Sequence, residues 1–263
     1  MLPVVELFTS IQGEGKYIGV PSHFVRVSGC NLRCVFKDSI CDTSYASFNP
    51  EKSRYKTNED FYEAFEQQCV KYPHVRHVVI TGGEPLMYKE ELETFLNKFK
   101  HYHLTVTIET NGSQNPLSKD LVDLYSISPK LSTSVGKSGI YQGITVTEEM
   151  IQRHDANRIN IESLTSLITN SKDYQLKFVY SDNSCIDEIE SIIKKLVDYS
   201  KNLGELEQGL ILNADEHIML MPEGIINDQL KVHREEIAQK CIENGWTMTD
   251  REHIIIWGDK REV

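Results

Sequence analysis

Short apolar runs rich in β-branched residues alternate with amphipathic stretches along most of the chain. The short runs predict strands at residues 4–8, 23–27, 75–81, 104–109, 124–128, 176–180, 209–212, 217–221 and 253–257. Apolar residues at helical spacing predict helices at residues 59–71, 89–100, 186–200 and 226–244. Phe61, Phe65 and Cys69 share one face of the first helix. Asn58 is its expected cap, and Gly245 is the expected stop of the last helix.

The repeated strand–helix order predicts an α/β fold in which helices cross over between parallel strands. We expect a partial (open) β/α barrel, with a doubly wound sheet as the alternative. Both architectures place a site at the C-terminal ends of the strands. The whole chain, residues 1–263, is expected to be a single domain. Around residues 132–172 the pattern weakens and Ser, Thr, Gly and Asn dominate, which indicates an insertion or a lid.

Size and charge narrow the functional classes. A chain of 263 residues is long enough to bury a large core without disulfides. Its 28 Lys and Arg against 39 Asp and Glu give a net charge of −11, which argues against a long nucleic-acid groove but allows a small anionic ligand. No apolar run approaches the ~18–20 residues of a membrane helix, and the N-terminus lacks a signal-peptide pattern. We therefore expect a cytoplasmic protein that binds neither nucleic acid nor membranes.

Three of the six cysteines, Cys30, Cys34 and Cys41, fall within twelve residues directly after the predicted strand 23–27. Three thiolates can hold three irons of a [4Fe–4S] cluster and leave the fourth iron open to a substrate or cofactor. Zinc is an alternative, although it prefers four protein ligands in a structural site and no obvious fourth lies nearby. Three unconnected core cysteines are a further alternative. The remaining cysteines are expected in the core: Cys69, Cys185 and Cys241.

Polar islands follow other predicted strands, at residues 11–15, 80–86, 108–112, 128–130 and 221–224. Gly82 and Gly83 would let a backbone edge approach a ligand closely. Arg26 can pair with a carboxylate in bidentate fashion or face solvent, and His217 is expected to be packed. Each island alone is compatible with an ordinary turn. Together they predict a site in which all of them meet at one mouth of one sheet.

The three cysteines, with residues 82–85, 109–112 and 128–130, resemble the radical S-adenosylmethionine (SAM) superfamily. Within it, five segments look like the 7-carboxy-7-deazaguanine synthase family: residues 11–15, 29–34, 41–43, 177–179 and 221–224. The resemblance implies a partial barrel of radical SAM type. It also implies a lyase that converts 6-carboxytetrahydropterin to 7-carboxy-7-deazaguanine with loss of ammonia, in the biosynthesis of 7-deazapurines such as queuosine.

The family resemblance also implies residue roles. Cys30, Cys34 and Cys41 would ligate the [4Fe–4S] cluster, and Thr43 would bind Mg²⁺. Residues expected to line the SAM site are Ile40, Asp42, Gly83, Ser128, Pro129 and Lys130. Residues expected to bind the pterin are Ile11, Gln12, Gly13, Arg26 and Thr81, with Arg26 pairing with its carboxylate. The implied partners are an external electron donor such as flavodoxin or ferredoxin, and a second copy of the chain in a homodimer.

The implied mechanism is reductive cleavage of SAM, hydrogen abstraction from the substrate by a 5′-deoxyadenosyl radical, and ring contraction. An activating enzyme for a glycyl-radical protein and a non-catalytic zinc- or cluster-binding module remain alternatives. The sequence departs from the family in two places. The family usually has two residues between the second and third cysteines and this chain has six, so residues 36–39 must loop out. Ile40 stands where an aromatic residue is common. The tail, residues 257–263, matches nothing and is left out of the site.

Overall fold

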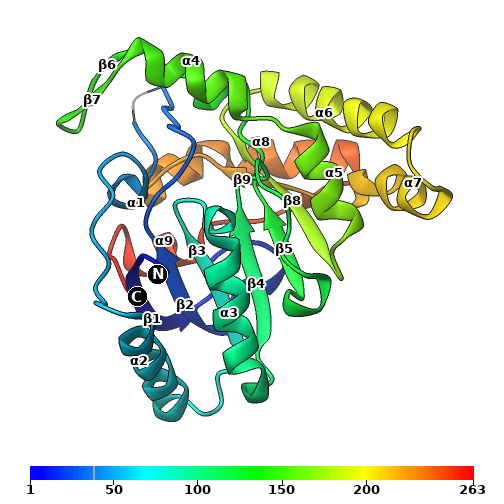
Figure 1. Cartoon of the computed structure of the whole chain (residues 1–263). Coiled ribbons are helices and arrows are strands. Elements are labelled where there is room, and N and C mark those ends of the chain that lie inside the picture. Colours follow the sequence, from blue (N-terminus) through cyan, green and yellow to red (C-terminus); the bar gives the residue numbers. More distant parts are fainter. Residues whose placement is uncertain (38) are drawn as a thin grey trace.

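An eight-stranded sheet forms the frame of the molecule (Figure 1), in a computed structural model that describes residues 1–37 and 39–263. Its strands are β1 (Val4–Ile11), β2 (Pro21–Val27), β3 (His77–Gly82), β4 (Thr105–Thr110), β5 (Leu124–Ile127), β8 (Tyr174–Tyr180), β9 (Ile218–Pro222) and β10 (Thr247–Met248). They lie side by side in chain order, and every neighbouring pair is parallel except β1 and β2. A separate hairpin is formed by β6 (Gly139–Tyr141) and β7 (Ile144–Val146).

β4 and β5 are connected through a 3₁₀ turn, Lys119–Leu121, whereas α-helices follow the other parallel strands. The helices are α1 (Ser44–Ser47), α2 (Asn58–Lys71), α3 (Lys89–Phe99), α4 (Glu148–Asn157), α5 (Ile161–Thr169), α6 (Ser184–Ser200), α7 (Glu205–Leu212), α8 (Asn227–Asn244) and α9 (Glu252–Trp257). A doubly wound sheet requires a point where the strand order reverses, and this sheet has none. With crossovers of one hand, the connecting helices cover one face and the sheet curls away from them. The expected partial barrel of parallel strands is therefore confirmed, with an antiparallel first strand added.

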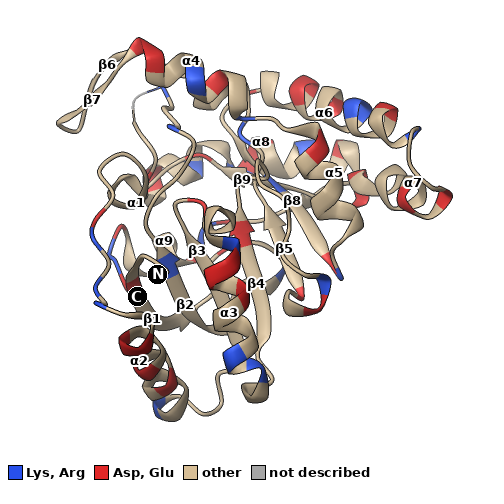
Figure 2. Cartoon of the chain, in the orientation of Figure 1, with Lys and Arg blue, Asp and Glu red and all other residues tan. Residues whose placement is uncertain are grey.

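The face of the sheet beneath the helices is apolar. Val25, Ile80 and Ile108 on successive strands are fully buried in one core cluster with side chains of α2, α3, α5, α6 and α8. Aromatic side chains of α2 and α3 pack against one another. For example, the rings of Phe65 and Phe95 make an edge-on contact with 4.9 Å between their centroids. Each large side chain buried there contributes about 1.5–3 kcal/mol. Figure 2 shows that Asp and Glu residues are frequent on helices such as α2 and α3, whereas the strands consist mostly of uncharged residues.

The antiparallel first strand corrects the expectation that every polar island meets at one mouth of the sheet. Ile11 at the end of β1 pairs with Pro21 at the start of β2, so the following segment lies where the parallel strands begin. Tyr17 packs edge-on against His77, the first residue of β3, and the Lys16 amide donates to Gln175 Oε1 on β8. Residues 12–20 therefore close the N-terminal end of the partial barrel.

Two predicted strands are wrong. Residues 209–212 form the last turns of α7, and residues 253–257 lie within α9. Apolar runs of this length fit either structure, and in both helices a single residue, Ile211 or Ile254, is buried. The cap of α2 is Thr57 rather than Asn58: its hydroxyl accepts from the Asp60 amide in a capping box. Gly245 ends α8 in the left-handed conformation, as predicted.

Residues 132–172 hold more regular structure than the sequence predicted. They contain the β6–β7 hairpin, α4 and α5, and α5 buries Leu164, Leu167 and Ile168 in the main core. The interpretation of this region as an insertion or lid on a single domain stays a prediction. In the described part of the chain, no helix is both long and apolar enough to cross a membrane.

Buried histidines predict an acid-sensitive fold. The two ring nitrogens of His77 are hydrogen-bonded to the hydroxyls of Ser22 and Thr107. Burial lowers the pKa of His77 to about 4, and it lowers the pKa values of His23 and His154 to about 4 as well. The unfolded chain binds these protons below about pH 6.5, so the free energy of unfolding should fall as the pH is lowered from about 6.5 to about 4. Replacing His77→Gln should remove up to about 3 kcal/mol of that fall, measured by urea unfolding at a series of pH values. An unchanged pH slope would contradict this.

Candidate functional site

The inner face of the sheet, away from the helices, carries a row of polar residues in register. Arg26 on β2 pairs with Thr81 on β3, Glu109 on β4 pairs with Ser126 on β5, and Ser126 pairs with Gln175 on β8. The side chains touch across the strands: Thr81 Oγ1 donates to Glu109 Oε2 at 2.7 Å, and Gln175 Nε2 donates to Ser126 Oγ at 2.7 Å. The period-two alternation of the strands thus puts an apolar surface under the helices and a polar row inside the barrel.

Glu109 is the centre of this row. Its second oxygen accepts from Gln12 Nε2 at 3.1 Å, and Gln12 is buried. Gln12 reaches Glu109 from the segment that closes the N-terminal end of the barrel. Thr81 reaches the same carboxylate from the neighbouring strand. Two residues predicted to bind substrate, Gln12 and Thr81, are therefore brought together by a residue that the sequence analysis quoted in a motif but did not place in the site.

The same closing segment sends Glu14 into the barrel, where it meets two cations. Lys177 on β8 forms an ion pair with one oxygen, and Arg251 Nε donates to the other at 2.9 Å. Burial alone would raise the pKa of Glu14, but the two cations outweigh it and hold that pKa well below its usual range. Lys177 is almost fully buried, and its pKa is raised by Glu14 against the effect of burial. Both groups are charged as a result.

The cysteine loop folds back on itself. Val35 and Ile40 form an isolated antiparallel bridge, and the Cys41 amide donates to the Cys34 carbonyl at 3.0 Å. The bridge brings the second and third cysteines next to each other despite their six-residue separation. Phe36 and Ser39, inside the turn, are joined by a backbone hydrogen bond of 2.7 Å. The expectation that the extra residues loop out is met at these positions, while Asp38 lies outside the described residues.

A second hydrophobic cluster covers this turn. Val35 and Ile40 pack with Val146 of β7 and Ile151 of α4, and all four are buried. Ile40, which the family resemblance places beside SAM, therefore also packs in this hydrophobic cluster. His154 of α4 accepts from the Arg33 amide at 3.3 Å, which ties the same helix to the cysteine loop.

The three clustered cysteines suit a group that carries positive charge. All are free thiols, and burial raises the pKa of each, that of Cys41 to about 12. Lys130 is near enough to lower the pKa of Cys30 and Cys34 partly, but it does not offset burial. Iron ions would supply the missing positive charge to the thiolates. Among residues 1–37 and 39–263, no three Cys, His, Asp or Glu side chains form a site for a single metal ion. The donor set fits a cluster held by three thiolates.

The Gly82–Gly83–Glu84 loop packs against the start of the cysteine loop. A Cβ on Gly83 would lie 1.9 Å from the Gly29 carbonyl oxygen and 2.7 Å from that of Ala46. The glycines therefore allow a close approach to protein backbone, and a role of Gly83 toward SAM stays a prediction. Glu84 is fully buried and accepts from Thr110 Oγ1 at 2.8 Å and from the Asn111 amide at 2.7 Å. This carboxylate joins the loops that follow β3 and β4.

The remaining SAM candidates lie at the C-terminal ends of the strands. Lys130 Nζ donates to Ser128 Oγ at 2.8 Å just after β5, and Pro129 between them is buried. Asp42 directly follows the third cysteine, and its Oδ1 accepts from Thr43 Oγ1 at 2.9 Å. Arg251 Nη2 donates to Asp42 Oδ2 at 2.5 Å, and this guanidinium lowers the pKa of Asp42 to about 2 although burial opposes it.

The C-terminal tail, which the sequence analysis left out, reaches the inner face. Arg261 Nε donates to Glu6 Oε1 at 2.5 Å on β1, and Arg26 Nε donates to Glu6 Oε2 at 2.5 Å. Glu6 has no exposed surface, so each arginine compensates a buried charge. Arg261 also stacks on Tyr45 and binds Glu51. The tail thus closes the side of the partial barrel between β10 and β1, where the two termini lie close together (Figure 1).

The structure gathers most predicted residues but divides them between two ends. Gln12 and Gly13 belong to the segment at the N-terminal end of the barrel. The three cysteines, Gly83 and residues 128–130 lie around its C-terminal end. Ile11 lies at the edge of β1, half-buried. The charged residues that the structure adds to this region, and that were not among the predicted site residues, are Glu6, Glu14, Glu109, Lys177, Arg251 and Arg261. For Glu6, Glu14, Glu109 and Lys177 the available signal was a charged residue inside an apolar strand or a motif, whereas Arg251 and Arg261 lie in polar segments that gave no such signal.

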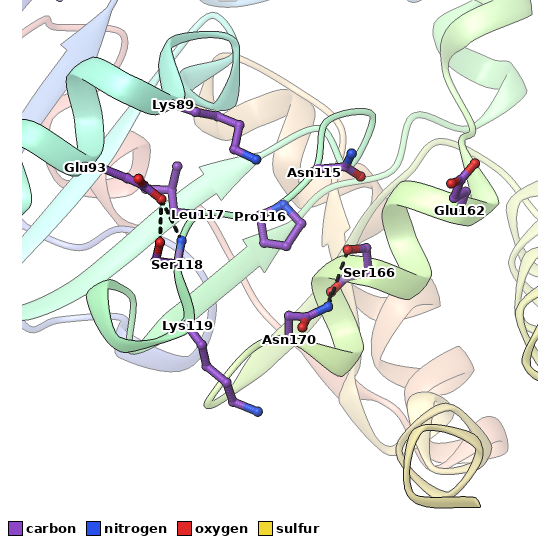
Figure 3. Close-up of a pocket in the computed structure, with 10 residues that line it drawn as sticks. All are labelled: Lys89, Glu93, Asn115, Pro116, Leu117, Ser118, Lys119, Glu162, Ser166 and Asn170. Carbon is purple, nitrogen blue, oxygen red and sulfur yellow. Dashed lines mark hydrogen bonds between the residues drawn. The ribbon is translucent and has the colours of Figure 1, made fainter. Parts of the chain in front are cut away.

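A surface pocket lies away from this site (Figure 3). It has a volume of about 510 Å³ between the start of α3, the loop after β4 and α5. Its lining is polar and includes Lys89, Glu93 and Glu162. Glu93 accepts from both the amide and the hydroxyl of Ser118, so that carboxylate is already occupied. The pocket shares no residue with the site described above.

Comparison with known proteins gives consistent results. The model of the radical SAM superfamily matches residues 24–130. The 7-carboxy-7-deazaguanine synthase of Halobacterium salinarum is 37% identical over 263 residues, covering 100% of this chain and 93% of the relative. That of Rhodopirellula baltica is 34% identical, covering 99% of this chain and 88% of the relative. Among solved structures, QueE from Escherichia coli is similar in fold, with a TM-score of 0.57 and 21% identity over 96% of this chain and 94% of that one.

The contact at Gly83 gives a prediction. Replacing Gly83→Ala should lower the free energy of unfolding by about 1–3 kcal/mol or more, because the new methyl group collides with rigid backbone. Iron bound per chain after reconstitution should fall with it. Gly209→Ala is the control, because Gly209 lies within α7 and its added Cβ would have no neighbour within 4 Å apart from the adjacent residues and the backbone of its own helix. Equal stability and iron content in the two variants would contradict the packing role of Gly83.

Proposed function

The chain belongs to the 7-carboxy-7-deazaguanine synthase family of radical SAM enzymes, and from that premise we propose which of its residues convert 6-carboxytetrahydropterin to 7-carboxy-7-deazaguanine. The observation that carries the proposal is the polar row inside the barrel, where Glu109 holds Gln12 and Thr81 beside Arg26. A polar heterocycle with a carboxylate needs such a set of donors and acceptors. The activating-enzyme and zinc-module alternatives have no comparable support.

The enzyme family uses a [4Fe–4S] cluster and SAM. Cys30, Cys34 and Cys41 would hold the cluster. When bound, the cluster and SAM together supply a 5′-deoxyadenosyl radical that can abstract a hydrogen atom from the substrate. Residues toward SAM would be Ile40, Asp42, Gly83, Ser128, Pro129 and Lys130. The ammonium of Lys130 and the hydroxyl of Ser128, already hydrogen-bonded to each other, offer two donors at the C-terminal end of β5.

We propose that the substrate lies between the two ends of the barrel. Ile11, Gln12 and Gly13 would bind it from the closing segment, and Arg26 and Thr81 would bind it from the strands. Glu6 engages Nε of Arg26, and among the described residues neither Nη group of Arg26 has a hydrogen-bond partner. The two Nη groups can therefore receive the pterin carboxylate. The protein would orient the substrate and exclude water from the reacting carbon.

Thr43 is proposed to bind Mg²⁺. Its hydroxyl donates to Asp42 Oδ1, so the lone pairs of Oγ1 face away from that carboxylate and are available to a cation. Magnesium keeps several waters and takes few protein oxygens, which fits one hydroxyl completed by substrate oxygens. The ion would hold the substrate carboxylate during the ring rearrangement.

The cellular setting is also proposed from the family. We propose a cytoplasmic homodimer that receives electrons from a donor such as flavodoxin or ferredoxin. A reducing compartment agrees with six free cysteines among the described residues. The net charge of −11 argues against a nucleic-acid partner.

An anaerobic reaction tests the function. Reconstituted protein with a reductant, SAM, 6-carboxytetrahydropterin and Mg²⁺ should give 7-carboxy-7-deazaguanine, detected by mass spectrometry. Cys41→Ala should abolish SAM cleavage, whereas Cys69→Ala, in the core on α2, should retain it. Formation of 5′-deoxyadenosine without the deazaguanine product would mean that the substrate is wrong. Full cleavage by Cys41→Ala would mean that the third ligand is wrong.

The magnesium role has its own prediction. Thr43→Ala should lower turnover by about tenfold or more and weaken the rate increase on adding Mg²⁺, because one hydroxyl ligand is lost. Thr43→Ser keeps the hydroxyl and should retain the response. The measurement is the initial rate of product formation across a Mg²⁺ titration. An equal magnesium response in the alanine variant and the wild type would remove the assigned role.

A further inference from the structure

Arg251 joins three segments that are far apart in the sequence. Its guanidinium donates to Glu14 Oε1 at 2.9 Å, to the Gly224 carbonyl at 2.6 Å and to Asp42 Oδ2 at 2.5 Å. Glu14 belongs to the segment that closes the N-terminal end of the barrel. Asp42 belongs to the cysteine loop, and Gly224 follows β9. The side chain of Arg251 is only 12% exposed, so these contacts are made largely out of water.

The two carboxylates depend on Arg251 to different degrees. Glu14 is also paired with Lys177, so it keeps one cation if the guanidinium is removed. Arg251 is the cation that forms an ion pair with Asp42 in the described part of the chain. The other oxygen of Asp42 accepts from Thr43. Movement of Asp42 is therefore transmitted directly to Arg251 and then to Glu14.

We infer that Arg251 is a positioning residue that couples SAM binding to pterin binding. This inference rests on the proposed function, which assigns Asp42 to SAM and the Gln12–Gly13 segment to the pterin. A ligand that fixes Asp42 fixes the planar guanidinium, which in turn fixes Glu14 and the backbone beside Gln12. Coupling between two sites is reciprocal, so each ligand strengthens the binding of the other by the same factor. A lysine ammonium cannot bridge the three acceptors in one plane.

The first test measures the affinity for SAM with and without 6-carboxytetrahydropterin, on reconstituted enzyme without reductant so that no turnover occurs. The wild type should bind SAM at least about fivefold more tightly when the pterin is present. Arg251→Gln and Arg251→Lys should bring this ratio close to one. The lysine variant keeps a cation beside Glu14 and so protects the fold.

Arg234→Gln is the matched control. Arg234 on α8 binds Asp250 at 2.5 Å, and Asp250 Oδ1 also accepts from the Arg251 backbone amide at 2.8 Å. The control therefore perturbs the backbone of the same C-terminal segment but leaves the guanidinium of Arg251 with its own partners. The control should keep the wild-type ratio. A wild-type ratio in both Arg251 variants, or a wild type that binds the pterin and has a ratio of one, would overturn the inference.

A second measurement separates this inference from the identity of the substrate. The amide of Gly15 donates to Thr249 Oγ1 at 2.7 Å and that of Lys16 to Gln175 Oε1 at 2.8 Å, so hydrogen exchange reports on this segment. SAM alone should slow amide exchange in residues 12–16 of the wild type and of Arg234→Gln, but not of the Arg251 variants. If the pterin does not bind and this protection persists, the proposed substrate is wrong and the coupling stands. If SAM gives no protection in the wild type, the coupling is wrong.

Discussion

A carboxylate inside a barrel must be paired, and the pairing of Glu14 determines how the ends of this fold meet. Lys177 and Arg251 provide two cations, one at each oxygen of the carboxylate. The desolvation of three charged groups is offset only because each keeps its partner in place. Because of this pairing, the segment after β1 stays at the N-terminal end of the barrel, and the C-terminal segment that carries Arg251 packs against it. The polar interior is thereby enclosed although the sheet itself does not close.

Much of the fold followed from local pattern, because the strands are short apolar runs rich in β-branched residues and helices such as α2 and α3 have one apolar face. The cysteine loop and the polar residues after β3, β4 and β5 were identifiable for the same reason: they interrupt apolar strands at their C-terminal ends. The antiparallel direction of β1 was not predictable, because a run such as residues 4–8 carries no mark of direction. Its consequence is large, since it moves Gln12 and Glu14 to the opposite end of the barrel.

The contacts of Arg251 and Arg261 lay beyond sequence reasoning for another reason. Arg251 and Glu14 are 237 positions apart, and their contact exists only once the sheet has curled. The neighbouring run 253–257 was apolar enough to be taken for a strand, which hid the tail's function as a closing segment. Glu84 is the converse case. Its motif suggested a ligand-binding loop, whereas its carboxylate joins two loops within the protein.

The turn between the second and third cysteines has a consequence for recognising such proteins. Because the Val35–Ile40 bridge pins the two ends of the turn, the number of residues beyond the bridge does not set the distance between Cys34 and Cys41. Spacing in the sequence is then a loose guide to geometry. A pattern search that demands two residues between these cysteines would overlook this chain, while a search for paired strand-forming residues flanking a turn of variable length would retain it.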